Sequence, residues 1–249
     1  MGWSAVMSYI EVKDACKKYF QNGTETTVLD HVSLDIEKGE FICLLGPSGC
    51  GKSTLLNALA GFEKVNSGSV KINNNEVTEP SEKNITIFQN YGLLPWRNVL
   101  KNVELGLETK KLPKEERQKI AEKYIELVGL KGYEKRHPKQ LSGGQQQRVA
   151  IARALVNDPV ILLADEATGN LDTRTSYEIM EIFQELNSRG KTIVFVTHEP
   201  DIATFSSRTI VLRDGQIKRD TPNGDVQNAH EAFMALPPPE TFDDEDESV

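Results

Sequence analysis

The stretch Gly46–Thr54, with the sequence Gly-Pro-Ser-Gly-Cys-Gly-Lys-Ser-Thr, constrains the fold of this 249-residue chain more than any other. It matches G-x-x-x-x-G-K-[ST], the pattern of a phosphate-binding P-loop. The apolar run Phe41–Leu45 precedes it and predicts a buried strand, and Thr54–Ala60 follows and predicts a helix. This context predicts an α/β fold in which the backbone N–H groups of the loop surround a polyphosphate. We therefore expect Lys52 to reach the β- and γ-phosphates and Ser53 to bind Mg²⁺.

Composition and charge add few limits. The chain is 38% hydrophobic and 27% charged, which is ordinary for a globular protein. Its net charge is −8, but the six acidic residues within 240–247 leave about −2 for the rest of the chain. A near-neutral body offers no strong electrostatic footprint for nucleic acid, so we expect no nucleic-acid partner. From Pro237 onward the acidic, proline-rich end predicts a disordered tail.

The N-terminus and the cysteines indicate the compartment. Residues 1–7 lack a basic segment followed by an apolar one, so we expect no secretory signal. No run approaches the roughly 18 apolar residues of a spanning helix. Cys16, Cys43 and Cys50 have no metal-type spacing, and their odd number argues against a disulfide framework. This favours a reducing compartment, with Cys50 either a small filler in the P-loop or a redox-sensitive thiol.

Hydrophobic patterns predict the remaining elements. We expect strands at 9–12, 27–36, 69–72, 85–88, 160–165 and 192–196, and a hairpin over 209–218. A turn at Asn22-Gly23 separates the first two strands, and the preceding Tyr19 and Phe20 serve either in the core or as a platform for a base. From residue 90 to about 156 the chain reads as mostly helical. One helix opens at Leu112-Pro113 and has an apolar face formed by Ile120, Tyr124, Leu127 and Val128.

Polar residues follow three predicted strands. After the strand 160–164, Asp165 suits the Mg²⁺ shell and Glu166 suits the polarisation of an attacking water. His198 ends the strand 192–196 and would place an imidazole near the γ-phosphate. Gln89 ends the strand 85–88, and its amide can touch Mg²⁺ or the water. The structural alternatives are an acidic turn at Asp165-Glu166 and a packing role alone for His198, and Gln89 by itself is weak evidence.

A second phosphate site is predicted at 141–148, which opens a helix with Ser142 as its N-cap candidate. Exposed glycines and a serine at a helix N-terminus form an anion site, although a simple capped helix is the alternative. A single nucleotide on one P-loop does not account for two such sites.

Together these motifs resemble the nucleotide-binding domain of an ABC transporter. Residues 46–54 match its Walker A motif, 160–166 its Walker B motif and 141–145 its signature motif. Gln89 matches the Q-loop. Three further short motifs also match, and all the motifs occur in the order that the family has. These are the D-loop at Leu171-Asp172, the switch histidine at His198 and the aromatic A-loop at Tyr19.

The resemblance implies a P-loop NTPase (RecA-like) core with an antiparallel β subdomain and an inserted α-helical subdomain. The expected boundaries are about 8–89 and 157–220 for the core, 90–156 for the helical subdomain and 237–249 for the tail, with 1–236 forming the ATPase domain. ATP would contact Tyr19, Gly46, Ser48, Gly49, Cys50, Gly51, Lys52, Ser53 and Thr54. Mg²⁺ would contact Ser53, Gln89 and Asp165, and the catalytic residues would be Glu166, His198 and Gln89.

The resemblance also implies partners. Two such domains pair head to tail, as a homodimer or with a sister ATPase. The signature of one chain, Ser142, Gly143, Gly144 and Gln145, then meets the ATP of the other, and Asp172 belongs to the D-loop. The chain would lie peripherally on the cytoplasmic face of the cell membrane, with a separate permease and, indirectly, a solute-binding protein. Leu94, Pro95 and Trp96 would begin a docking groove, although a core position for Trp96 is an equal alternative.

The subfamily signals are mixed. Residues 45–51, 60–64 and 89–99 look like importers of nitrate, sulfonate, taurine or bicarbonate, whereas 145–148, 163–172 and 197–203 look like the lipoprotein-release and macrolide-efflux group. A soluble ABC ATPase of DNA repair or translation is a third hypothesis, but the chain lacks a long coiled-coil insert. Ala167 replaces the usual proline after Glu166, and we expect little effect on the chemistry.

Overall fold

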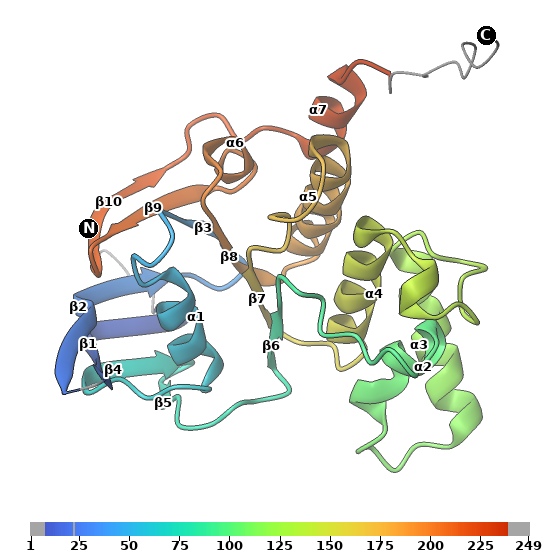
Figure 1. The fold of residues 1–249 in the computed structure, drawn as a ribbon, viewed down its shortest axis with the longest axis horizontal. Coiled ribbons are helices and arrows are strands. Elements are labelled where there is room, and N and C mark those ends of the chain that lie inside the picture. Colours follow the sequence, from blue (N-terminus) through green and yellow to red (C-terminus); the bar gives the residue numbers. More distant parts are fainter. Residues whose placement is uncertain (1–7, 22, 239–249) are drawn as a thin grey trace, which may run out of the picture.

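The computed structural model describes residues 8–21 and 23–238, which form two sheets and a group of helices (Figure 1). The central sheet has six strands in the order β10-β9-β3-β8-β7-β6. Its strands are β3 (Phe41–Leu45), β6 (Asn84–Ile87), β7 (Ile161–Asp165), β8 (Thr192–Thr197), β9 (Arg208–Arg213) and β10 (Gln216–Pro222). All neighbours are parallel except β9 and β10, which form the hairpin predicted from the sequence. The carboxyl ends of the parallel strands therefore meet at one edge of this sheet.

The second sheet is antiparallel, in the order β2-β1-β4-β5. It contains β1 (Ile10–Gln21), β2 (Thr24–Ile36), β4 (Ser67–Ile72) and β5 (Asn75–Glu76). The predicted strand 9–12 was too short, because β1 runs on to Gln21, and β5 was not predicted. Three register shifts interrupt the pairing of β1 with β2, after Val12, Ala15 and Lys17, which is why the pattern did not reveal the full length of β1. The predicted turn at Asn22-Gly23 includes Asn22, which lies outside the described residues.

Helices between β6 and β7 form the right-hand part of Figure 1. They are α2 (Val99–Val103), a 3₁₀ turn at Glu104–Leu107, α3 (Lys114–Leu127), a 3₁₀ turn at Pro138–Gln140 and α4 (Gly143–Leu155). The predicted apolar face of α3 was only partly correct. Ala121 and Ile125 are fully buried together with Val128, whereas Ile120, Tyr124 and Leu127 are half-buried against the same core.

Two hydrophobic cores lie on the two faces of the central sheet. One packs α1 (Lys52–Ala60) and the antiparallel sheet around Ile42, Leu44 and Leu55. The other packs α4 and α5 (Thr173–Ser188) around Phe183 and Phe195. The P-loop lies between β3 and α1, so the central sheet holds it firmly in place.

The remaining helices are short. α6 (Pro200–Ala203) follows β8, and α7 (Ala229–Ala235) packs on α5 at the end of the described chain. Of the predicted tail at 237–249, only Pro237 and Pro238 belong to the described residues. No helix in the described ranges is long and apolar enough to cross a membrane.

Candidate functional site

The P-loop forms one wall of a cavity of about 270 Å³ at the carboxyl edge of the central sheet. The cavity is lined by Tyr19, Val28, Ser48, Gly49, Gly51, Lys52, Ser53, Thr54 and Glu166. Gly51 caps α1 with a φ of 106° and packs against the backbone of Val28, where a Cβ atom would lie 2.6 Å from the carbonyl oxygen. Only glycine fits this position, because a side chain would overlap the backbone of Val28. With no side chain at Gly51, the N-terminus of α1 stays open to a phosphate.

Lys52 is buried at the base of this loop. Its ammonium group donates hydrogen bonds to the carbonyl oxygens of Gly46 at 2.7 Å and Pro47 at 2.9 Å. These bonds hold a positive charge inside a loop whose backbone N–H groups also favour anions. The donor set therefore fits a polyphosphate.

Gly46 and Cys50, both predicted to contact ATP, do not line the cavity. Cys50 is buried in the core on the α1 face of the sheet. A Cβ atom at Gly46 would overlap the carbonyl oxygen of Leu212 and lie 2.8 Å from the Cys50 sulfur. Both residues therefore shape the loop from behind.

Ser53 and Asp165 join the P-loop to the end of β7. The Ser53 hydroxyl donates a hydrogen bond of 3.0 Å to Oδ1 of Asp165. Burial raises the pKa of Asp165, while the bond from Ser53 and the charge of Lys52 act in the opposite direction. A hydroxyl and a carboxylate at this separation form a pair of oxygen donors that fits Mg²⁺.

Glu166 and His198 follow the neighbouring strands β7 and β8. His198 Nδ1 lies 3.4 Å from Oε1 of Glu166. Glu166 adopts a positive φ of 47°, and its backbone N–H donates to the carbonyl oxygen of Val196 at 3.0 Å. A non-glycine residue in this conformation is uncommon and re-aims its side chain, here into the cavity. Ala167, next in the chain, is buried.

Gln89 lies beside this group without lining the cavity. It follows β6, is exposed, and has its amide nitrogen near Gly169, where a Cβ atom would lie 3.2 Å from it. The structure thus brings Gln89 close to the loop that follows Glu166.

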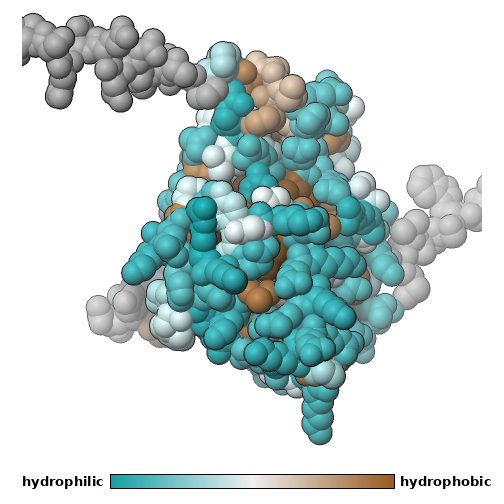
Figure 2. Space-filling model, turned by 90° about the vertical axis from the view of Figure 1, so that its right-hand side faces the viewer, coloured by the Kyte–Doolittle hydropathy of each residue, from teal (hydrophilic) through white to brown (hydrophobic). Residues whose placement is uncertain are grey.

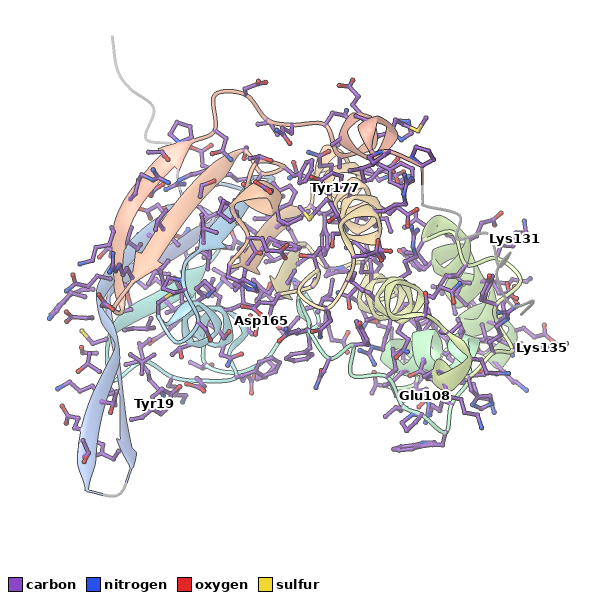
Figure 3. The ribbon with its side chains drawn as sticks, turned by 45° about the horizontal axis from the view of Figure 1, so that its top comes forward. Tyr19, Glu108, Lys131, Lys135, Asp165 and Tyr177 are labelled. Carbon is purple, nitrogen blue, oxygen red and sulfur yellow. The ribbon has the colours of Figure 1, made fainter. Side chains whose placement is uncertain are left out.

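Tyr19 projects from β1 over the P-loop side of the molecule (Figure 3). Its hydroxyl donates a hydrogen bond to Glu63, which follows the end of α1, and the Lys17 ammonium lies 5.1 Å from its ring centroid. Partial burial raises the pKa of Tyr19. Phe20 is 74% exposed, so its core alternative is wrong. Glu63 had no sequence signal, because its link to Tyr19 spans two separate elements.

The Ser142–Gln145 segment caps α4 instead of joining this cavity. The Ser142 hydroxyl accepts from the Gln145 N–H at 3.3 Å, and Gln145 Oε1 accepts from the Ser142 N–H at 3.0 Å. This capping box confirms Ser142 as an N-cap. Gly143 packs near the Tyr91 hydroxyl, and a Cβ atom at Gly144 would overlap Cγ2 of Thr175. In the described chain, none of these four residues lines the P-loop cavity.

Asp172 caps α5. Its carboxylate accepts from the Thr175 N–H at 2.9 Å and from the Thr175 hydroxyl at 2.6 Å. These bonds lower the pKa of Asp172. Thr175 therefore contacts both Asp172 and Gly144, a connection that sequence reasoning missed. The Asp-x-x-Thr spacing gave only a weak capping signal for it.

Comparison with known proteins gives a consistent result. Residues 29–169 match the family model described as ABC transporter. An uncharacterized ABC transporter ATP-binding protein of Methanocaldococcus jannaschii is 46% identical over 84% of this chain and 80% of its own. The spermidine/putrescine import ATP-binding protein PotA of Clostridioides difficile is 43% identical over 92% of this chain and 67% of its own.

A solved structure is similarly close. The dimeric structure of the bacterial ABC transporter cassette MJ0796 superposes with a TM-score of 0.80 at 40% identity, covering 86% of this chain and 98% of that one. The same cassette in a post-hydrolysis state bound to ADP and Pi gives 0.78 at 38% identity, with the same coverage of both chains.

Proposed function

The chain belongs to the ABC transporter family, and on that premise we propose that it energises the import of a small anion through a separate membrane permease. It is the ATP-binding, ATP-hydrolysing subunit of an ABC transporter. The observation that carries the proposed mechanism of ATP hydrolysis is the separation of the predicted nucleotide-site residues into two places. Lys52, Ser53 and Glu166 line one cavity, whereas Ser142–Gln145 open a helix elsewhere in the chain. The proposed site is therefore composite, with its second half supplied by another chain.

In this proposal the P-loop holds ATP. Lys52 binds the β- and γ-phosphates, and Tyr19 stacks on the base. Ser53 and Asp165, with Gln89 from the neighbouring loop, are the residues that would hold Mg²⁺. That ion would neutralise charge on the phosphates.

Glu166 accepts hydrogen bonds from the attacking water and orients it. His198, 3.4 Å from that carboxylate, holds it in place and donates toward the γ-phosphate. Because both groups end adjacent parallel strands, a small shift between β7 and β8 would change their separation. The geometry thus allows hydrolysis to depend on closure of the site.

Closure requires a second nucleotide-binding domain, and the dimeric cassette MJ0796 supports this part of the proposal. Ser142, Gly143, Gly144 and Gln145 of one chain would bind the phosphates held by the other. Asp172 and Thr175 tie the signature helix to α5, so the D-loop and the signature would move together. We also propose that the ATPase domain covers 1–236, with its core at about 8–89 and 157–220 and its helical subdomain at about 90–156.

Exposed aromatic side chains near Gln89 suggest where the permease docks. Trp96 is 72% exposed, so its core alternative is wrong, and Phe62 stacks on Phe88 with ring centroids 6.1 Å apart at the surface. The outer face of helices α2–α4 is mainly hydrophilic, with small hydrophobic patches (Figure 2). We propose that Phe88 and Trp96 contact the permease and that the chain lies peripherally at the cytoplasmic face of the membrane.

The direction and solute rest on sequence. Residues 89–99, which include Trp96 of the proposed permease contact, favour import of a solute of the nitrate, sulfonate, taurine or bicarbonate class. Such an importer would also use a solute-binding protein. The name of PotA supports import by a relative of this chain, although its solute is a polyamine. Residues 163–172 favour the alternative, an efflux or lipoprotein-release system.

Uptake measurements separate these alternatives. Deletion of the gene in the source cell should abolish uptake of one radiolabelled anion of this class, and the wild-type gene should restore it. A gene encoding Glu166→Gln should not restore it. If the deletion strain takes up nitrate, sulfonate, taurine and bicarbonate normally but retains lipoproteins or becomes sensitive to macrolides, the efflux or lipoprotein-release alternative is established.

A further inference from the structure

Two consecutive β-bulges in the β1–β2 ladder gather four side chains that the ATP site does not use. Between the pairs Val12–Leu34 and Ala15–Val32, β1 carries one extra residue, and Asp14 takes a φ of 49°. Between Ala15–Val32 and Lys17–Leu29, β2 carries the extra residue. His31 there takes a φ of 52°. The bulges bring the Asp14 carboxylate against the His31 ring and the His31 backbone against the Cys16 sulfur.

Three of these side chains converge. The Cys16 sulfur, a carboxylate oxygen of Asp30 and a ring nitrogen of His31 all lie within 4.8 Å of one another. The Nε2 atom of His31 is 3.9 Å from Oδ1 of Asp30, and the His31 backbone N–H donates to the Cys16 sulfur at 3.3 Å. Tetrahedral zinc with bonds of about 2.0–2.3 Å separates its ligand atoms by about 3.3–3.8 Å. Small rotations of the exposed His31 and half-buried Asp30 side chains toward the buried Cys16 sulfur would bring these three atoms to ligating distances.

Asp14 gives the cluster a feature expected of a metal site. Its Oδ1 lies 2.6 Å from Nδ1 of His31. This contact places the ring proton on Nδ1, which leaves the Nε2 lone pair directed away from Asp14 and available to a metal. Metal-bound histidines almost always donate the N–H of their other ring nitrogen to an outer acceptor, which is a carboxylate, a backbone carbonyl or a water.

We infer that Cys16, Asp30 and His31 form a Zn²⁺ site, with Asp14 as the outer partner that orients His31. The sulfur and imidazole donors favour zinc over Mg²⁺ and Ca²⁺, which take oxygen ligands. Binding releases the Cys16 thiol proton to solvent, and a water completes the tetrahedron. In the described ranges no other group of three such side chains lies as close together.

The position of the site suggests its effect. Cys16 is 8% exposed and precedes Tyr19 by three residues on the same strand, so the metal would tie β1 to β2 beside the residue that covers the P-loop. It would therefore stabilise the bulged hairpin. This inference does not depend on which solute the transporter carries.

The test uses the full chain without nucleotide, at about pH 8 because Asp14 raises the pKa of His31. Calorimetric titration with ZnCl₂ should give one high-affinity site. Co²⁺ in place of zinc should give a sulfur-to-cobalt charge-transfer band in the near ultraviolet. Cys16→Ser should abolish that band, and His31→Asn, which keeps a residue tolerant of positive φ, should weaken zinc binding at least 100-fold. Asp14→Asn should weaken it by roughly 10- to 100-fold.

Matched controls are available. His230→Asn removes a histidine that pairs with Glu181 on a different face and should leave the zinc affinity unchanged. Each variant should keep its far-ultraviolet circular dichroism and its affinity for ATP. Zinc bound instead between Glu166 and His198 would give no sulfur band. The inference is overturned if the wild-type chain lacks the band, or if Cys16→Ser and His31→Asn bind zinc as tightly as the wild type.

Discussion

Nδ1 of His198 lies 3.4 Å from Oε1 of Glu166, across the carboxyl ends of the adjacent strands β7 and β8. The two residues belong to different strand–loop units, 32 positions apart in the chain, and parallel pairing brings them together. Glu166 lines the P-loop cavity, and this contact holds the His198 imidazole beside its carboxylate. The proposed hydrolysis of ATP depends on that arrangement.

Replacement of the carboxylate should stop turnover without stopping binding. In Glu166→Gln the amide cannot accept the water proton, so ATP hydrolysis should fall by roughly 10²–10⁴-fold. The affinity for ATP should persist, and size-exclusion chromatography should show an ATP-dependent dimer. Glu181→Gln, which alters a carboxylate far from the cavity, serves as the control. Normal phosphate release by Glu166→Gln would remove Glu166 from its proposed role.

The Ser53–Asp165 hydrogen bond predicts a pH dependence. Burial raises the pKa of Asp165 above its ordinary value, and the Ser53 hydroxyl limits the rise. Because Mg²⁺ binds the carboxylate form, the affinity for MgATP should fall as the pH falls through this raised pKa. In Ser53→Ala the midpoint should move to higher pH, measured by titration of MgATP at several pH values.

The same raised pKa gives a definite sign for stability. The folded state holds the Asp165 proton more tightly than the unfolded state does. The contribution of Asp165 to the free energy of unfolding therefore falls as the pH rises from about 3.9 through the raised pKa.

The control for the MgATP titration is Ser48→Ala. It changes a P-loop hydroxyl that does not contact Asp165, so the pH midpoint of MgATP binding should stay where it is. If the pH midpoint of MgATP binding in Ser53→Ala were unchanged or lower than in the wild type, the Ser53 hydroxyl would not be what limits the rise in the pKa of Asp165.

Tyr19 should contribute through its ring and not through its hydroxyl. Loss of the ring in Tyr19→Ala should raise the Kd for ATP by about ten-fold or more, since stacking on a base contributes about 1–3 kcal/mol. Tyr19→Phe keeps the ring and loses only the bond to Glu63, so its Kd should stay within about two-fold. Calorimetry in the absence of Mg²⁺ measures both. Equal affinity in all three proteins would show that Tyr19 only packs against Glu63.

Asp172 should contribute to stability as a helix cap. Asp172→Ala removes the bonds to Thr175 and should lower the free energy of unfolding by about 1 kcal/mol, a shift in Tm of roughly 2–4 °C. Asp172→Asn keeps a good N-cap and should lose much less. The depressed pKa of Asp172 means that its contribution is complete above an ordinary carboxyl pKa and is lost as the pH falls through the depressed value. A Tm equal to that of the wild type in Asp172→Ala would refute the capping role.

Local patterns predicted the elements that hold the nucleotide. The strand Phe41–Leu45, the helix after the P-loop and the N-cap at Ser142 were each predicted from neighbouring residues, because buried strands, glycines and caps have short-range signatures. The apolar face of α5 follows the same helical spacing, with Ile179, Ile182, Phe183 and Leu186 all buried.

The parts that were missed depend on contacts between distant residues. The bulge at Asp14 interrupts the alternation of β1, so that strand was predicted to end too early, and the bulge at His31 interrupts the facing strand β2. The spacing of Cys16 within the chain indicated no metal site, since its neighbours His31 and Asp30 come from the facing strand. The positive φ of Glu166 and the packing of Gly144 on Thr175 also have no local signature.

The central claim is that each ATP site joins the P-loop of one chain to the signature of another. Lys52→Ala and Ser142→Arg chains should each lack ATPase activity when tested alone, the first through its P-loop and the second through its signature. When the two are mixed, a heterodimer contains one intact pair, formed by the P-loop of one chain and the signature of the other. Phosphate release from an equimolar mixture should then recover to about a quarter of the wild-type rate, given random pairing and independent sites. A mixture no more active than its two components would contradict the composite site.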